Sequence, residues 1–151
     1  MKITLTALVL FGMILYLSNC KSAGTVQKDP MDAGRARMSA DVLASIKGKE
    51  QMEVEKVFKN LKVLSGFPAE NLVFAMEVWS KALGVTCAYC HDTFDWASDI
   101  KNEKEISREM VRLAEKINAD LTKINNLGSE KPIVNCVTCH RGEMKPALRM
   151  E

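Results

Sequence analysis

The stretch Cys87-Ala88-Tyr89-Cys90-His91 decides how this chain is interpreted, and a second stretch of the same form follows at Cys136-Val137-Thr138-Cys139-His140. Together these two motifs use four of the 5 cysteines and both of the 2 histidines in the 151-residue chain. The spacing Cys-x-x-Cys-His is the attachment signature of c-type haem, in which both thiols bond to the porphyrin and the adjacent histidine binds the iron. Each motif therefore predicts one covalently attached haem c.

Three other interpretations of the cysteines account for less of the pattern. Zinc held by two Cys-x-x-Cys pairs would need the pairs closer in sequence, and zinc leaves the repeated histidine unexplained. A thioredoxin-like dithiol needs a strand–turn–helix setting and would not occur twice. Plain disulfides are the usual expectation for an even number of cysteines in an exported chain. Haem attachment is the only one of the four that uses the histidines as well.

The N-terminal residues have the layout of a secretory signal. Lys2 precedes an almost unbroken apolar run over residues 3–17, which is short for a membrane-spanning helix. Cys20 stands where bacterial lipoproteins are cleaved and lipidated, although Asn19 departs from the small residue usual before that cysteine. We expect a signal peptide over residues 1–19, with an uncleaved anchor helix as the alternative. The protein is then exported and lipid-anchored through Cys20 on the periplasmic side of a bacterial membrane.

Between the signal and the haem motifs, composition predicts a tether and then one domain. Residues 20–49 are rich in small and charged residues and predict a flexible tether, with at most a short helix near 41–46. Residues 50–151 are long enough for one dihaem domain. The formal net charge of +2 argues against a nucleic-acid partner, which requires a concentrated basic surface.

Helical periodicity dominates the predicted domain. Apolar residues recur at helical spacing over residues 50–64, between Pro68 and Gly84, and over residues 103–124. No stretch alternates for long enough to predict a strand. The fold class is therefore all-α, with two helix–loop–Cys-x-x-Cys-His repeats, one for each haem.

Methionine sulfur is the natural sixth ligand for iron here, because both histidines are already used. Met76 and Met110 lie in the middle of the helical apolar stripes that precede the two motifs, although methionine at such positions often only fills space. Met52 and Met144 are the competing sulfurs.

Residues around both motifs resemble the cytochrome c subunit of photosynthetic reaction centres over about residues 52–147. The resemblance is carried by segments 60–64, 68–70 and 83–87 in the first half, and by 108–110, 117–118 and 136–142 in the second. It implies Met76 as sixth ligand for the haem on Cys87 and Cys90, and Met110 for the haem on Cys136 and Cys139. The family's subunit carries four haems on a longer chain, so this chain corresponds to half of it.

The predicted function is electron transfer rather than the conversion of a substrate, so the protein is not expected to be an enzyme. Its partners would be redox proteins, either a reaction-centre-like or a respiratory complex. The alternative is a haem enzyme or gas sensor with one five-coordinate iron. That alternative needs an acid–base group on the open side of the haem, and no histidine is left to supply it.

Overall fold

The computed structural model describes residues 29–128 and 131–149, and these residues form helices joined by loops, with no strand among them. The helices are α2 (Asp32–Ser45), α3 (Val54–Val57), α4 (Ala69–Leu83), the 3-10 helix η1 (Cys87–Tyr89), α5 (Asn102–Leu121) and α6 (Cys136–His140). The predicted all-α class is confirmed. The predicted signal peptide and Cys20 lie outside the described residues, and no helix in the described ranges is long and apolar enough to cross a membrane.

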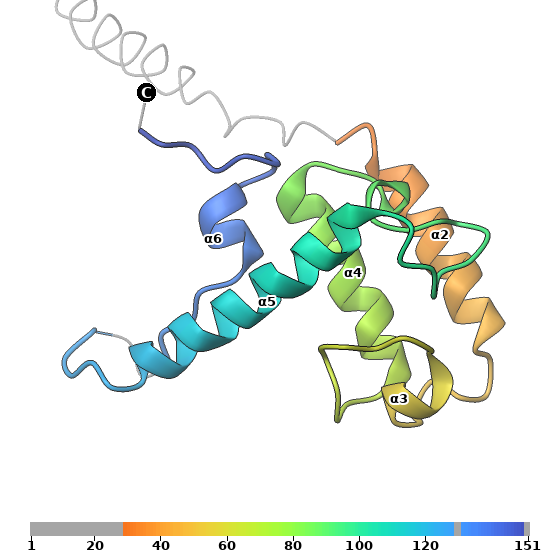
Figure 1. Cartoon of the computed structure of the whole chain (residues 1–151), viewed down its shortest axis with the longest axis horizontal. Helices are drawn as coiled ribbons and strands as arrows, with labels where there is room; N and C mark the ends of the chain where they lie inside the picture. Colours follow the sequence, from red (N-terminus) through yellow and green to blue (C-terminus); the bar gives the residue numbers. More distant parts are fainter. Residues whose placement is uncertain (1–28, 129–130, 150–151) are drawn as a thin grey trace, which may run out of the picture.

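Helix α4 is the centre of the fold, because α2, α3, η1 and α6 all pack against it (Figure 1). Its limits are those that the sequence predicted. Pro68 precedes the first turn with a φ of −61°, and Gly84 ends the helix in the left-handed region with a φ of 64°. The amide of Val85 then donates to the carbonyl of Ser80 at 2.9 Å, so the chain turns sharply away from the helix.

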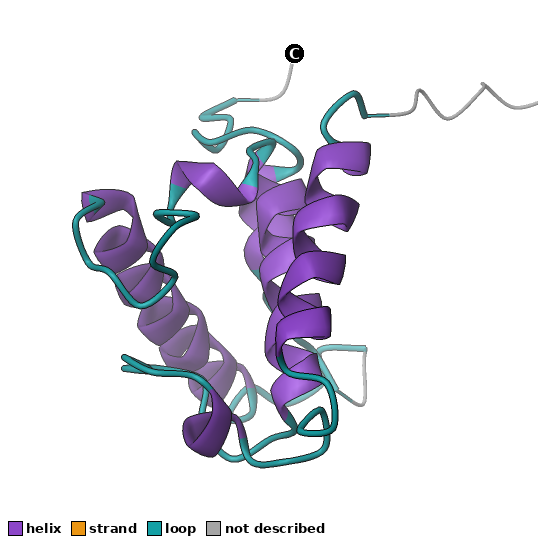
Figure 2. Ribbon diagram, turned by 90° about the vertical axis from the view of Figure 1, so that its right-hand side faces the viewer, coloured by secondary structure: helices purple, strands orange, loops and turns teal. Residues whose placement is uncertain are grey.

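Helix α2 lies beside α4 and replaces much of the predicted tether (Figure 2). The sequence predicted at most a short helix near residues 41–46, whereas a 14-residue helix packs into the fold. Its buried side chains are Arg35 and Ser39, and the guanidinium of Arg35 donates to the carbonyl of Val85 at 2.8 Å and pairs with Asp29. The sequence of this helix shows no apolar stripe. Its most deeply buried side chain is the cation Arg35, which is held by hydrogen bonds and an ion pair.

The predicted helix over residues 50–64 is wrong, since only the four residues of α3 are helical there. The segment closes into a loop: Val54 donates to the carbonyl of Phe67 at 3.0 Å, and Ala69 donates to that of Met52 at 2.9 Å. Asn60, in the left-handed region with a φ of 60°, donates from its side chain to the carbonyl of Ala97 at 2.6 Å. Contacts with the loop before α5 therefore override the local helical period.

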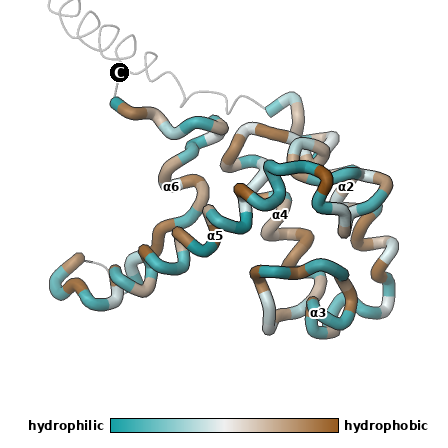
Figure 3. The backbone as a smooth tube through the Cα atoms, in the orientation of Figure 1, coloured by the Kyte–Doolittle hydropathy of each residue, from teal (hydrophilic) through white to brown (hydrophobic). Residues whose placement is uncertain are grey.

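Helix α5 runs almost as predicted, ending at Leu121 rather than 124, but its apolar stripe is not covered by protein. Ile106, Met110 and Leu113 are 52%, 43% and 48% exposed, and the hydropathy of α5 alternates along its length in Figure 3. Val111 is its one buried apolar residue. The remaining core gathers around α4: Ile46, Val54, Ala69, Leu72, Val73, Ala82 and Val85.

Candidate haem-binding site

The first motif forms a tight turn directly after α4. Cys87 begins η1, Cys90 caps its end, and the amide of His91 donates to the carbonyl of Cys87 at 3.1 Å. Both thiols are partly buried and unbridged, and the sulfur of Cys90 lies 3.6 Å from the hydroxyl of Ser107 on α5. The turn thus places the motif between the end of α4 and the first half of α5.

The imidazole of His91 packs against the indole ring of Trp96. Its Nδ1 is buried without a hydrogen-bond partner, and the ring lies 5.3 Å from that of Trp96 at an interplanar angle of 52°. Burial lowers the pKa of His91, and the positive charge of Lys104 lowers that pKa further. A lowered pKa favours the neutral ring, which is the form that binds a metal.

The second motif is helical, and its histidine is oriented by a hydrogen bond. Asn135 and Thr138 form a capping box at the start of α6, with the amide of Thr138 donating to Asn135 Oδ1 at 3.2 Å. Nδ1 of His140 donates to the carbonyl of Glu143 at 3.0 Å. A proton fixed on Nδ1 leaves the lone pair of Nε2 free for iron, as in metal sites whose histidine is held by a backbone carbonyl.

The chain after α6 brings the second motif to the same end of α4 as the first. The amide of Gly142 donates to the carbonyl of Ala82 at 2.8 Å. The approach is so close that a Cβ on Gly84 would lie 1.9 Å from the carbonyl oxygen of Gly142. Cys87 follows Gly84 by three residues. One helix end therefore fixes both motifs relative to each other.

The surroundings of the four described cysteines can be compared with the alternative interpretations. All four described cysteines are free thiols, and residues 29–128 and 131–149 contain no group of three or more His, Cys, Asp or Glu that could hold a metal ion. Burial raises the pKa of Cys87, Cys90 and Cys136, whereas a dithiol redox site needs a lowered thiol pKa. The raised pKa values of Cys87 and Cys90 argue against a dithiol redox site at the first motif.

Both expected methionine ligands lie on the helix that precedes their motif in sequence. Met76 is half-buried on α4, and Met110 is exposed on the open stripe of α5. The competing sulfurs of Met52 and Met144 lie in exposed loops. A flat apolar group on α5 would bury the stripe that protein leaves open, so the residues present fit a haem.

Sequence reasoning missed the polar groups that surround the first motif. Lys101 donates to the carbonyl of Ala88, inside the motif, and Lys104 donates to the carbonyl of Trp96 at 3.0 Å. Arg108 pairs with Asp99 at 2.9 Å. Lys101, Lys104 and Arg108 are spaced by three and four residues, a signal that they share one helical face.

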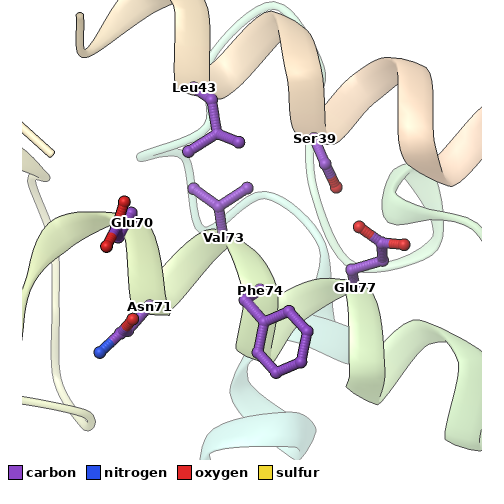
Figure 4. A pocket seen from close by; sticks show the side chains of 7 residues that line it. All are labelled: Ser39, Leu43, Glu70, Asn71, Val73, Phe74 and Glu77. Carbon is purple, nitrogen blue, oxygen red and sulfur yellow. The ribbon is translucent and has the colours of Figure 1, made fainter.

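A shallow groove between α2 and α4 is separate from this site (Figure 4). Leu43 and Val73 point toward each other there, and Ser39 faces Glu77. Neither motif contributes a residue to its lining.

Comparison with known proteins gives one family. The family model described as photosynthetic reaction centre cytochrome c subunit matches residues 21–149. Cytochrome c-554 of Chloroflexus aurantiacus is 37% identical over 82 residues, which are 54% of this chain and 20% of the relative. The photosynthetic reaction center cytochrome c subunit of Rubrivivax gelatinosus is 31% identical over 110 residues, which are 71% of this chain and 28% of the relative. That of Thermochromatium tepidum is 35% identical over 101 residues, 66% of this chain and 23% of the relative. The chain thus matches less than a third of the length of each of these relatives.

Proposed function

Because the chain belongs to the photosynthetic reaction centre cytochrome c subunit family, we propose that it is a dihaem c-type cytochrome that transfers single electrons. One observation carries the proposal: the Gly142–Ala82 hydrogen bond brings two Cys-x-x-Cys-His motifs to one end of α4. Two redox groups fixed by one helix end suit electron transfer, whereas a haem enzyme would need a further acid–base group and both histidines already belong to the motifs.

The residues of each motif have distinct roles in this proposal. Cys87 and Cys90 hold one haem, and Cys136 and Cys139 hold the other, each through thioether bonds. His91 and His140 would be the proximal ligands, and the Glu143 carbonyl holds the proton of His140 on Nδ1, which leaves the lone pair of Nε2 available to bind iron. When bound, haem c supplies a one-electron iron couple. The chain supplies orientation and excludes water, and no bond of a substrate is made or broken.

Met76 and Met110 complete the proposed coordination as sixth ligands. Support comes from their positions, because each lies on a helix beside apolar neighbours one turn away, such as Leu72 for Met76 and Leu113 for Met110. Thioether sulfur favours the ferrous state and so raises the reduction potential.

Export and anchoring form a separate part of the proposal. Cleavage before Cys20 and lipidation of its thiol would hold the protein on the periplasmic side of the membrane, within reach of a reaction-centre-like or respiratory redox partner. Cys20→Ala should release the protein from membranes without changing its spectrum, because anchoring and haem attachment use different cysteines. A variant that stays in the membrane fraction points to an uncleaved anchor helix instead.

Haem counting tests the central claim with variants that control for each other. The parent protein should retain two haems per chain after acid–acetone extraction. The pair Cys87→Ala/Cys90→Ala should retain only the haem of the second motif, and the pair Cys136→Ala/Cys139→Ala only that of the first. A parent with one haem or none, or a variant pair that loses both haems, would contradict independent attachment at two motifs.

A further inference from the structure

We propose that Lys104 is a positioning residue for the first motif: its buried ammonium holds Trp96 against His91 and raises the reduction potential of the first haem above that of the second. The inference rests on the proposed dihaem function. It concerns a side chain that belongs to neither motif and lies in the first turn of α5.

The ammonium of Lys104 is enclosed by oxygen atoms of the loop that follows the first motif. Nζ donates to the carbonyl of Trp96 at 3.0 Å and to that of Ser98 at 2.8 Å, and lies 3.4 Å from a carboxylate oxygen of Asp99. Lys104 as a whole is 9% exposed. These three oxygens match the three donors of an ammonium group, so a buried charge is satisfied locally.

This arrangement connects Lys104 to His91 through one residue. The carbonyl of Trp96 accepts from Lys104, and the indole ring of the same residue packs 5.3 Å from the imidazole of His91. Nδ1 of His91 has no hydrogen-bond partner, and the Trp96 ring is the aromatic group that packs against the imidazole. Lys104 therefore acts on the proposed iron ligand by fixing the loop that carries Trp96.

The charge of Lys104 also belongs to a cationic cluster made of Lys101, which caps the start of α5, and of Lys104 and Arg108 within α5. Asp99 pairs with Lys62, Lys104 and Arg108, and Glu105 also pairs with Lys62 and Arg108. Lys101 adds a further positive charge whose ammonium donates to the carbonyl of Ala88 and makes no ion pair among the described residues.

The second motif has no comparable arrangement in the described part of the chain. The basic residues near it are Arg141, Lys145 and Arg149, and all three are exposed. Exposed charges are screened by water and salt, whereas buried charges are screened much less. Because ferric iron carries one more positive charge than ferrous iron, a buried cation favours the ferrous state, and the two haems are expected to differ in potential with the first higher.

The test is a redox titration of the complete protein with both haems attached. Lys104→Met removes the charge and keeps an unbranched chain, Lys104→Arg keeps the charge, and Lys116→Met is the control on an exposed part of α5. We expect K104M to shift the equilibrium of electron exchange between the haems by about tenfold away from the first, equivalent to about 59 mV for one electron. K104R and K116M should leave this equilibrium near that of the parent.

The outcomes separate this inference from the proposed function. The single-haem variants with alanines at one motif assign each potential to its haem. A parent that lacks two covalent haems overturns the function. Two haems with an unchanged first potential in K104M, or an equal shift in K104R, overturn the role of the Lys104 charge. If K104M does not accumulate, Lys104→Gln keeps a donor toward the carbonyls while removing the charge, and an unchanged potential in K104Q overturns the inference equally.

Discussion

Gly84 lies where the segment after the second motif packs against the end of α4, just before the first motif. Its substitution should push this segment away from α4. Alanine there would have to adopt a φ of 64° and place its Cβ 1.9 Å from the backbone oxygen of Gly142. The left-handed conformation costs about 1 kcal/mol, and displacing Gly142 from the carbonyl of Ala82 costs about 1 kcal/mol more. We expect Gly84→Ala to lower the free energy of unfolding by at least that sum, as measured in urea.

Gly48→Ala is the matched control for this prediction. Gly48 also has a positive φ, 82°, but a Cβ there meets nothing within 4 Å. It should therefore show the conformational cost of about 1 kcal/mol alone. Equal destabilisation by both variants would mean that the approach of Gly142 contributes nothing.

Met76 and Met110 can be tested one at a time, because leucine is close to methionine in volume. Met76→Leu or Met110→Leu should cost less than about 1.5 kcal/mol in packing. Loss of an iron ligand should instead turn one haem high-spin, remove about half of the ferric methionine–iron charge-transfer band and lower that haem's potential. The visible spectrum and a redox titration measure both effects. If one variant keeps the full band and both potentials, that methionine only packs, and Met52 or Met144 becomes the candidate.

Asp99 lies in the loop between the first motif and α5, and its carboxylate pairs with Lys62, Lys104 and Arg108. The hydrogen bond from Arg108, then that from Lys62, holds the pKa of Asp99 well below its ordinary range. A carboxyl with a lowered folded-state pKa stabilises the fold above its unfolded pKa of about 3.9, and this stabilisation is lost as the pH falls toward the folded value.

Asp99→Asn should therefore be less stable than the parent at neutral pH, and the difference should shrink below about pH 4. Urea unfolding of both proteins across a pH series measures it. Asp120→Asn is the control, since Asp120 pairs with Lys123 on the surface and such pairs contribute about 0–1 kcal/mol. A difference between parent and Asp99→Asn that is constant with pH would contradict this role of the charge.

Among the helices, those whose ends depend on their own residues were predicted correctly from the sequence. Pro68 and Gly84 set the ends of α4 through their own backbone preferences, so its limits were predictable. Helix α2 was missed because its buried residues include Arg35, whose partners lie on other segments. The helix expected at 50–64 failed because Asn60 makes hydrogen bonds to residues far along the chain, which no local period encodes.

The candidate site divides in the same way. Each motif is a continuous stretch of sequence, so its residues could be identified from their spacing alone. The roles of Lys104, Trp96 and the Glu143 carbonyl depend on how loops fold back onto the motifs. The sequence signalled only that Lys101, Lys104 and Arg108 share a face of one helix.

For the whole molecule, haem removal should affect the helices unequally. Helix α4 keeps buried residues such as Leu72 and Val73 against its neighbours, whereas Ile106 and Leu113 on α5 are about half exposed. In a haem-free variant with all four motif cysteines changed to alanine, we expect backbone amides of α5 to exchange with deuterium much faster than those of α4. Attachment of both haems should protect α5. Equal protection of α5 with and without haem would show that its stripe is not a haem surface.

The contact of Gly142 with Ala82 also has a consequence for how the connecting segment can vary. This contact closes a segment of roughly 60 residues that contains η1, α5 and α6. The entropy of closing a flexible loop rises only with the logarithm of its length, by about 0.6 kcal/mol per doubling. Insertions after Leu121 and before Val134, which two hydrogen bonds hold to Asn118, are therefore expected to change stability little. Because the spacing of the motifs is fixed at the end of α4, a longer connecting segment should leave the electron-tunnelling distance between the two proposed haems unchanged.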